Sequence, residues 1–479
     1  MTISAVKAEK PLITDNDFLD QIEKLDSALM DEYKSKMRID HALNRKIVSF
    51  QGNKETPFYR WYKYKEGFSA HLVEYYIRGH GLDITKKVLD PFAGSGAALF
   101  GASGLGIDAL GIELLPIGQY IIKTREMLAH FANADFERLF WWRNAKPWIR
   151  HEGQVDFTAL KITEGAYSEE NSALIKKYLS CMRDENENVQ AVLLFVLLCV
   201  LEDISFTRKD GQYLRWDQRS GRCLGAIPFS KGEIRHFSNA ITEKLAEILS
   251  DAKLDDSASS FDFSDHAAEK GKVAVIGGSC LNELPRIRAN SVDLVITSPP
   301  YCNRYDYTRT YALELAMLGV DEKRLLSLRQ EMLSCTVENR EKNLLAINPA
   351  WEGALSICKD QKLLQNILKY LYYKKEKKTL NNNGIPRMIK GYFYEMACVI
   401  FELCRVLVSG GEVIMVNDNV RYAGASVSVD LILSDIAAQT GFQIEEIAVL
   451  PLGKGNSSQQ MGAHGREPLR KCVYTWRKK

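Results

Sequence analysis

The sequence predicts an α/β protein with a Rossmann-like, doubly wound sheet and large, mainly helical insertions. A short apolar segment at 87–92 runs into a glycine-containing loop and a helix of small residues, and a second apolar segment follows at 107–112. A doubly wound sheet begins with a strand, a loop, a helix and a second strand in this order. The alternation stops near residue 124 and resumes at residue 272, so the long segment between them is predicted to be an insertion.

The bulk composition is typical of a soluble globular protein. The chain has 479 residues, of which 46% are hydrophobic and 26% are charged, and this length is too great for one ordinary core. The formal net charge is only +2. Any surface that binds nucleic acid must therefore be a local basic patch balanced by acidic residues elsewhere.

Cysteine usage and hydropathy predict the compartment. The ten cysteines are scattered, with no CxxC pair and no cluster with histidine, so we expect no metal site and reduced thiols. The N-terminus lacks the apolar region of a signal peptide. The most apolar stretch, 189–201, is shorter than the roughly 20 residues of a membrane span. We therefore expect a cytoplasmic protein that has no membrane partner.

The first part of the chain predicts a lead-in followed by half of the sheet. Apolar residues at helical spacing within 15–43 predict a helix in an N-terminal helical lead-in, 1–57. The first half of the main domain is predicted over 58–123, and Ser69 is a suitable N-cap for its first helix. The elements expected in this half are a helix at 69–77, a strand at 87–92, a helix at 97–103 and a strand at 107–112.

Two insertions are predicted. Residues 124–268 are expected to form a largely helical domain, a candidate for target recognition, whose acidic and serine-rich end at 251–265 predicts a flexible linker. Residues 320–390 are expected to form a second, irregular insertion that carries the basic run 374–378 and is a candidate for DNA contact.

The rest of the sheet is predicted from two separate segments, 269–319 and 391–479. The first contains expected strands at 272–276 and 292–297, with a helix at 281–287 between them. The second contains an expected helix at 392–407, a turn at 409–411, a strand at 412–417, a helix at 430–440 and closing strands at 443–450 and 471–476.

The loop after the first strand predicts a nucleotide-like cofactor. Glycines there allow the backbone to approach a ligand, and Glu113 at the end of the next strand can accept hydrogen bonds from both ribose hydroxyls. There is no GxGxxG cradle for a pyrophosphate, while Asp90 places a carboxylate where a cation is favourable. S-adenosylmethionine has no pyrophosphate and carries a sulfonium and an ammonium, so it is the predicted cofactor. The predicted cofactor loop is Asp90, Pro91, Phe92, Ala93, Gly94, Ser95 and Gly96.

A second motif follows the strand at 292–297 and predicts the catalytic residues Ser298, Pro299, Pro300 and Tyr301. An exocyclic amine of a base is a poor nucleophile because its lone pair is delocalised into the ring. The Ser298 hydroxyl and the Pro299 carbonyl, held rigid by the diproline, can accept both amine hydrogens and free the lone pair. Tyr301 offers a flat face for a flipped base. The alternative is that Pro-Pro-Tyr ends the strand for conformational reasons alone.

With both motifs, the chain resembles the amino-methyltransferases of bacterial restriction–modification systems, which methylate cytosine N4 or adenine N6 in DNA. The resemblance spans roughly 58–120, 272–318 and 392–476. It implies a Rossmann-like methyltransferase fold that binds S-adenosyl-L-methionine, with Phe68 and Ser69 at the methionine end of the cofactor. The family's acidic residue beside the cofactor adenine is absent here, which leaves Ser279 as the candidate. The serine form of the catalytic motif is more typical of cytosine N4 than of adenine N6.

Three groups of residues are candidates for DNA contact, because cations neutralise phosphates and aromatic side chains accompany them. Each group has a plainer alternative, namely a solvated loop or, for Arg304, an ion pair with Asp306. The candidates are Arg208, Lys209, Arg215 and Arg219 in the first insertion, Lys374 and Lys375 in the second, and Arg304 and Tyr305 after the catalytic motif.

The sequence thus predicts a site-specific methyltransferase of cytosine N4 in double-stranded DNA, with a cognate restriction endonuclease acting separately. Methylation of adenine N6, of RNA, or of a protein glutamine amide remains an alternative, as does an inactive DNA-binding regulator. The basic and aromatic insertions favour nucleic acid over glutamine, and the intact Ser298, Tyr301 and Glu113 argue against an inactive protein.

Overall fold

The sheet at the centre of the protein has eight strands. A computed structural model describes residues 14–44, 46–65, 67–81, 83–210, 213–222, 228–258, 270–451 and 469–479. The strand order is β1-β11-β12-β8-β7-β2-β3-β6. All neighbouring strands pair in parallel except β12, which is antiparallel to both β11 and β8. The strands are β1 (Met37–Ile39), β2 (Lys87–Asp90), β3 (Asp108–Glu113), β6 (Val273–Gly277), β7 (Val292–Thr297), β8 (Leu407–Asp418), β11 (Phe442–Val449) and β12 (Lys471–Lys478).

This sheet confirms the predicted Rossmann-like α/β fold. The chain runs from β2 outward to β3 and β6, and then returns to the other side of β2 through β7 and β8. The order of the strands therefore reverses between β2 and β7. In open α/β sheets a ligand binds at such a switch point, outside the carboxyl ends of the strands.

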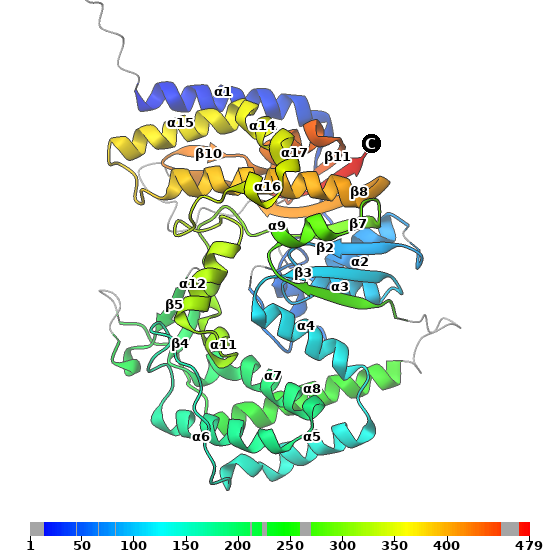
Figure 1. Ribbon diagram of the computed structural model, residues 1–479, viewed down its shortest axis with the longest axis vertical. Helices are drawn as coiled ribbons and strands as arrows, with labels where there is room; N and C mark the ends of the chain where they lie inside the picture. The colour runs from blue at the N-terminus through cyan, green and yellow to red at the C-terminus, as the bar shows by residue number, and fades with distance from the viewer. Residues whose placement is uncertain are drawn as a thin grey trace, which may run out of the picture.

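Helices cover both faces of the sheet, so its central strands are apolar on both sides. Val88 of β2 belongs to the core under α2 and α3, while the next residue, Leu89, belongs to the core under α16 and α17. Figure 1 shows α2 and α3 on one side of β2 and β3, and α16 and α17 above β7 and β8. The helices are α2 (Ala70–Gly79), α3 (Ala97–Ser103), α9 (Cys280–Glu283), α16 (Ile385–Val406) and α17 (Val429–Thr440).

The first insertion is helical, as expected, and forms the lower body in Figure 1. Its core surrounds the apolar helix α7, whose residues from Val189 to Ile204 are largely buried. The expected boundary at residue 124 falls inside a helix, because α4 runs from Pro116 to Leu128. The elements are α4, α5 (Asn133–Ala145), α6 (Glu169–Cys181), α7 (Glu187–Ile204), α8 (Phe237–Ala258) and the hairpin β4 (Thr207–Asp210) with β5 (Tyr213–Trp216).

The expectation of a flexible linker from residue 251 is wrong over its first part, because α8 continues to Ala258. The Asp251 side chain is fully buried and accepts hydrogen bonds from the Phe58 backbone, the Arg60 guanidinium and the Trp61 indole. A buried, fully bonded carboxylate fixes this turn of helix to the chain ahead of the sheet. The expected linker at 259–265 lies outside the described residues.

The second insertion is helical rather than irregular, which corrects the expectation for 320–390. After β7 the chain forms short helices at the junction of the two bodies and then longer ones that pack on α16. These helices are α10 (Tyr307–Thr310), α11 (Ala312–Met317), α12 (Glu322–Glu331), α13 (Leu344–Ile347), α14 (Glu352–Asp360) and α15 (Lys362–Glu376).

The N-terminal lead-in is also not purely helical. Its helix α1 (Asp15–Tyr33) packs along α15, as Figure 1 shows at the top of the molecule. The chain then adds β1 to the edge of the main sheet, parallel to β11. The expected turn at 409–411 lies within β8, where Gly410 has a φ of +76°. A second small hairpin, β9 (Val420–Tyr422) and β10 (Ala425–Val427), follows β8.

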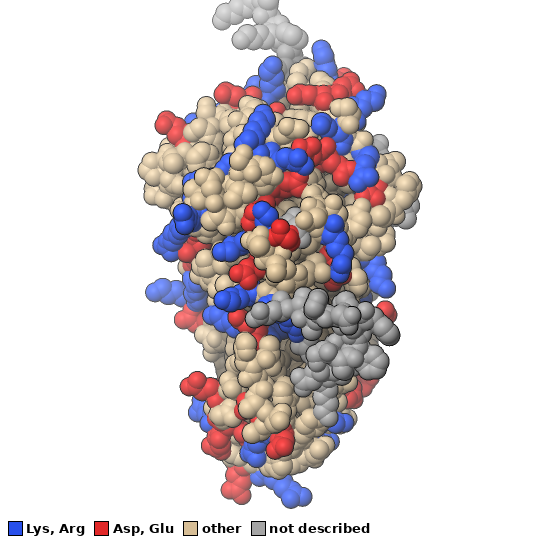
Figure 2. Space-filling view, turned by 90° about the vertical axis from the view of Figure 1, so that its right-hand side faces the viewer, with Lys and Arg blue, Asp and Glu red and all other residues tan. Residues whose placement is uncertain are grey.

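The described residues contain neither a candidate membrane-spanning helix nor a candidate metal site. Within the described ranges, no helix is long and apolar enough to cross a membrane. The same residues include no group of three or more His, Cys, Asp or Glu side chains that could hold a metal ion. On the face shown in Figure 2, basic and acidic side chains are interspersed, in keeping with the small net charge.

Candidate active site

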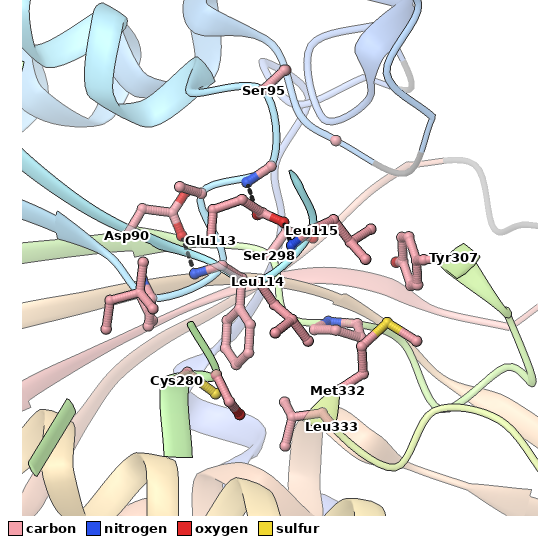
Figure 3. A pocket seen from close by; sticks show the side chains of 18 of the residues that line it. Asp90, Ser95, Glu113, Leu114, Leu115, Cys280, Ser298, Tyr307, Met332 and Leu333 are labelled. Carbon is pink, nitrogen blue, oxygen red and sulfur yellow. Dashed lines mark hydrogen bonds between the residues drawn. The ribbon is translucent and has the colours of Figure 1, made fainter. Parts of the chain in front are cut away.

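A pocket lies at the switch point of the sheet and contains about 780 Å³ of empty space, including its open mouth. The loops that follow β2, β3, β6 and β7 all contribute to it, as the fold requires. Most of the predicted cofactor residues and part of the predicted catalytic motif come together here (Figure 3). The predicted residues that line it are Phe68, Asp90, Pro91, Phe92, Ala93, Gly94, Ser95, Glu113, Ser279, Ser298 and Pro300.

The two loop glycines are required by conformation and packing. Gly94 has a φ of +55° and Gly96 a φ of +81°, in the region that favours glycine. A Cβ on Gly94 would lie 2.9 Å from the Tyr64 ring, and one on Gly96 would lie 2.9 Å from Ile122. Gly94 lines the pocket, whereas Gly96 is the N-cap of α3. Gly96 therefore affects the conformation of the loop without lining the pocket itself.

Asp90 ends β2 and is only 1% exposed. Its carboxylate accepts hydrogen bonds from the Thr297 hydroxyl at 2.6 Å and from the Phe92 backbone at 3.0 Å. Burial raises the pKa of Asp90 to about 7 despite these bonds. Because Thr297 immediately precedes Ser298, the first bond ties the predicted cofactor loop to the predicted catalytic motif.

Glu113 ends β3 and is buried beside Asp90. One oxygen accepts a hydrogen bond from the Gly94 backbone and the other accepts one from the Leu115 backbone, both at 2.7 Å. Each oxygen keeps a second lone pair that a ribose hydroxyl can use. Burial raises the pKa of Glu113 to about 8. Two buried carboxyls in one pocket fit a cationic ligand, which would stabilise both as carboxylates.

The predicted catalytic motif lies at the end of β7, where a hydrogen bond joins its first and last residues. The Ser298 hydroxyl donates to the Tyr301 hydroxyl at 3.1 Å. Ser298 and Pro300 line the pocket, while Pro299 and Tyr301 are buried behind them. Cys302 is also buried, and this burial raises the pKa of its thiol. A buried thiol of raised pKa is a poor nucleophile.

Several pocket residues were not predicted from the sequence. Met332 and Leu333 follow α12 in the second insertion and lie across the pocket from Ser95 (Figure 3). Tyr64 and Cys280 also contribute to the apolar lining. No short motif marks Met332 or Leu333, because the packing of α12 places them beside a loop more than two hundred residues earlier. The aromatic run at 59–65 is the signal that points to Tyr64.

Two predicted cofactor residues have other partners. The Ser69 side chain is buried and donates to the Ile47 carbonyl at 2.7 Å, and it makes no capping bond to α2. Ser69 therefore stands behind Phe68 and is not among the pocket residues. The Ser279 hydroxyl lines the pocket but donates to the Glu331 carbonyl at 2.8 Å. This bond joins the loop after β6 to the segment that carries Met332.

Lys209 and Lys374 are corrections to the predicted DNA contacts. Lys209 is 3% exposed, and its ammonium pairs with Glu314 and bonds to the Tyr62 hydroxyl inside the protein. Lys374 is largely buried and pairs with Asp15 of α1 at 2.7 Å. Both ammonium groups are committed to internal carboxylates, so neither is placed to contact a phosphate.

The other predicted DNA contacts are spread over the molecule. Arg208 is exposed on β4, Arg215 pairs with Asp210 and Arg219 pairs with Asp217, all near the β4–β5 hairpin. Lys375 is exposed at the end of α15, well away from that hairpin in Figure 1.

The residues just after the motif are more buried than expected. Tyr305 is buried, and its ring contacts that of Tyr307 at 4.7 Å between centroids. Arg304 is half-buried with a φ of +68°. The Asp306 carboxylate pairs with Arg309 and Arg329.

The switch-point pocket, its two buried carboxyls and the strand order of the sheet fit an S-adenosylmethionine-dependent methyltransferase of Rossmann-like fold. The comparisons with known proteins give the family. No family model matches the chain. It is 53% identical over 467 residues to Type II methyltransferase M.AvaI of Nostoc sp. and of Anabaena variabilis, covering 96% of this chain and 95% of each relative. It is 38% identical over 486 residues to Type II methyltransferase M.BsoBI of Geobacillus stearothermophilus, covering 97% and 93%.

The chain therefore belongs to the Type II DNA methyltransferases of restriction–modification systems, and its cofactor is S-adenosylmethionine. Among solved structures, a complex of Haemonchus contortus phosphoethanolamine N-methyltransferase 1 is 10% identical with a TM-score of 0.13, covering 98% of this chain and 99% of that one. A likeness at this score supports no inference about the fold.

Proposed function

We propose that the protein transfers a methyl group to the N4 amine of cytosine at a specific sequence in duplex DNA. The observation that carries this proposal is the position of Ser298. Ser298 lines the pocket, and its hydroxyl donates a hydrogen bond to the Tyr301 hydroxyl. Because the Ser298 hydroxyl donates its hydrogen to Tyr301, it can only accept a hydrogen bond from a substrate. An amine hydrogen is the group such a site accepts.

The chemistry follows from the needs of an amine on an aromatic ring. S-adenosylmethionine, when bound, supplies an electrophilic methyl group on a sulfonium. Ser298 and the Pro299 carbonyl would accept the two amine hydrogens, which draws the nitrogen toward tetrahedral geometry and directs its lone pair at the methyl group. The diproline keeps both acceptors fixed before the substrate arrives, so little ordering remains to be done in the transition state.

The cofactor would be held by residues at the ends of β2 and β3. Glu113 would accept the ribose hydroxyls, and Asp90 would stabilise the positive charge of the methionine portion. Met332, Leu333 and Cys280 offer apolar surface for the adenine ring. The target base must leave the duplex to reach Ser298. Tyr301 is buried behind Ser298 and hydrogen-bonded to it, so it would act through its hydroxyl rather than by the predicted stacking on the base.

The choice of cytosine rests on Ser298 itself. The serine form of the motif resembles the cytosine N4 enzymes, whereas an aspartate at this position is usual in the adenine N6 enzymes. Both side chains accept a hydrogen bond, so identification of the methylated nucleoside decides between them.

The test uses the purified full chain, labelled S-adenosylmethionine and unmethylated duplex DNA of mixed sequence. After digestion to nucleosides we expect the label in N4-methylcytosine. Label in N6-methyladenine would assign the enzyme to the other base and overturn the proposal. Ser298→Ala serves as the control for enzyme-dependent transfer, because it removes one of the two acceptors and leaves the pocket open.

We also propose that the enzyme protects DNA from a separate restriction endonuclease of the same sequence specificity. Plasmid DNA from cells that express the chain should resist at least one Type II endonuclease that cleaves the same plasmid from cells expressing Ser298→Ala. Cleavage of both plasmids by every endonuclease of a broad panel would contradict this role.

A further inference from the structure

A lysine from the last strand of the sheet reaches the catalytic motif. The Lys471 ammonium lies 3.4 Å from the Tyr301 hydroxyl and donates a hydrogen bond to it. The same ammonium lies 5.3 Å from the centroid of the Tyr301 ring. Lys471 begins β12, so 170 residues of chain separate it from Tyr301.

The lysine is itself fixed from the neighbouring strand. Lys471 is opposite Asp418 in the antiparallel pairing of β12 with β8, and its ammonium lies 3.2 Å from the Asp418 carboxylate. Both side chains are largely buried, with 15% and 8% of their surface exposed. An ion pair shielded from water in this way holds the ammonium in one place more firmly than a surface pair would.

The directions of the hydrogen bonds determine which group donates and which accepts at the Tyr301 hydroxyl. An ammonium has donors and no acceptor, so the Tyr301 oxygen must accept from Lys471. The phenol hydrogen therefore points away from the lysine. The phenol oxygen also accepts a hydrogen bond from the Ser298 hydroxyl at 3.1 Å. Ser298 is left with its lone pairs as the groups it can offer to a base amine.

We propose that Lys471 is a positioning residue for methyl transfer, which holds the Tyr301 hydroxyl as an acceptor and so keeps Ser298 in its accepting orientation. Asp418 supports it by fixing the ammonium. This inference rests on the proposed transfer to a base amine, and it holds whether that base is cytosine or adenine. It extends the catalytic motif by two residues from β8 and β12.

The test is a double-mutant cycle on single-turnover methyl transfer at saturating DNA and cofactor. Lys471→Met keeps the length of the side chain and removes the charge and the donors. We expect the rate to fall by about 10- to 100-fold, the scale of loss that accompanies a misplaced catalytic group, with the affinity for S-adenosylhomocysteine unchanged. Lys471→Arg keeps a cationic donor and should restore much of the rate.

Tyr301→Phe distinguishes the route of the effect, because it removes the hydroxyl and keeps the ring. If Lys471 acts through that hydroxyl, adding Lys471→Met to Tyr301→Phe should cause no further loss. Lys478→Met, at the other end of β12, is the matched control and should transfer at the wild-type rate.

Two results would overturn the inference. If the fold-losses in transfer rate of the two single variants multiply in the double variant, Lys471 does not act through the Tyr301 hydroxyl. Weaker DNA binding by Lys471→Met, with the slope of log affinity against log salt reduced by about one, would identify Lys471 as a phosphate contact. The base that wild-type enzyme methylates is read separately from its product, so failure of the cytosine assignment leaves this test intact.

Discussion

Tyr301 and Pro299 are proposed to act in methyl transfer, whereas Asp90 and Glu113 are proposed to bind the cofactor. Both are buried behind Ser298 at the end of β7, while Asp90 and Glu113 line the pocket at the ends of β2 and β3. We expect Tyr301→Ala and Pro299→Ala to abolish methyl transfer and to leave binding of S-adenosylhomocysteine intact by calorimetry. Loss of that binding in either variant would mean that the motif belongs to the residues that bind the cofactor.

Asp90 and Glu113 predict how cofactor affinity depends on pH. Burial raises the pKa of Asp90 to about 7 and that of Glu113 to about 8, so both gain negative charge as the pH rises from 6 to 9. A cationic sulfonium should bind more tightly as they ionise, by about tenfold across this range. The neutral thioether of S-adenosylhomocysteine should gain less.

Calorimetric titration of the two compounds at each pH measures the difference between them. Glu113→Gln is the useful variant, because it removes the group of higher pKa and should flatten the rise above pH 7.5. Parallel pH profiles for the two compounds in the wild type would contradict the electrostatic role of Asp90 and Glu113.

Among the elements, the end of α8 illustrates how a buried carboxylate joins two distant segments. Asp251 bonds to Phe58, Arg60 and Trp61 ahead of the first sheet strand. Asp251→Ala leaves these donors unsatisfied, and we expect a loss of about 3 kcal/mol in the free energy of unfolding. Urea denaturation measures it, and Glu247→Ala, which breaks a partly exposed pair with Lys244 on the same helix, should cost at most about 1 kcal/mol.

The β4–β5 hairpin carries two of the predicted DNA contacts side by side. Arg208 and Arg215 are directly opposite each other in its register, and although Arg215 also pairs with Asp210, a phosphate that contacted both arginines would be neutralised by two cations. We therefore expect Arg208→Ala with Arg215→Ala to weaken DNA binding and to reduce the salt slope by about two. Fluorescence anisotropy at several salt concentrations tests this, and an unchanged slope would exclude the hairpin from the interface.

The sequence predicted those parts of the site that follow directly from strand ends. Asp90–Gly96 and Ser298–Tyr301 each come straight after an apolar strand, and parallel strands bring such ends to one edge. Met332 and Lys471 were missed because long-range packing and strand pairing place them. Lys209 was misassigned for a similar reason, since its partner Glu314 is 105 residues away and leaves no local signal.

Strand length explains the main error in the fold. The three residues of β1 are too few for a periodic pattern, so their pairing with β11 was invisible beside the clear helix at 15–33. The helices of the second insertion were missed because the basic run at 374–378 and the asparagine-rich segment 381–384 suggested irregular chain. Most of that run belongs to α15, whose other face is buried on α1 and α16.

At the scale of the whole molecule, the pocket joins the sheet to the second insertion. The Glu331 carbonyl accepts from Ser279, and Met332 and Leu333 face the cofactor loop. We expect S-adenosylhomocysteine to slow amide hydrogen exchange in 331–334 as well as in 92–96. Protection of the cofactor loop alone would show that the insertion does not contact the ligand.

The pairing of β1 with β11, and of β12 with β8, has a consequence for synthesis in the cell. Strands β1 and β12 come from distant parts of the chain and lie in the same sheet, so the sheet cannot close while β12 is still inside the ribosome. Lys471 begins β12, so it joins the site only after that strand has been made. We therefore expect nascent and prematurely terminated chains to be inactive, so that a cell gains modification capacity only from fully translated copies.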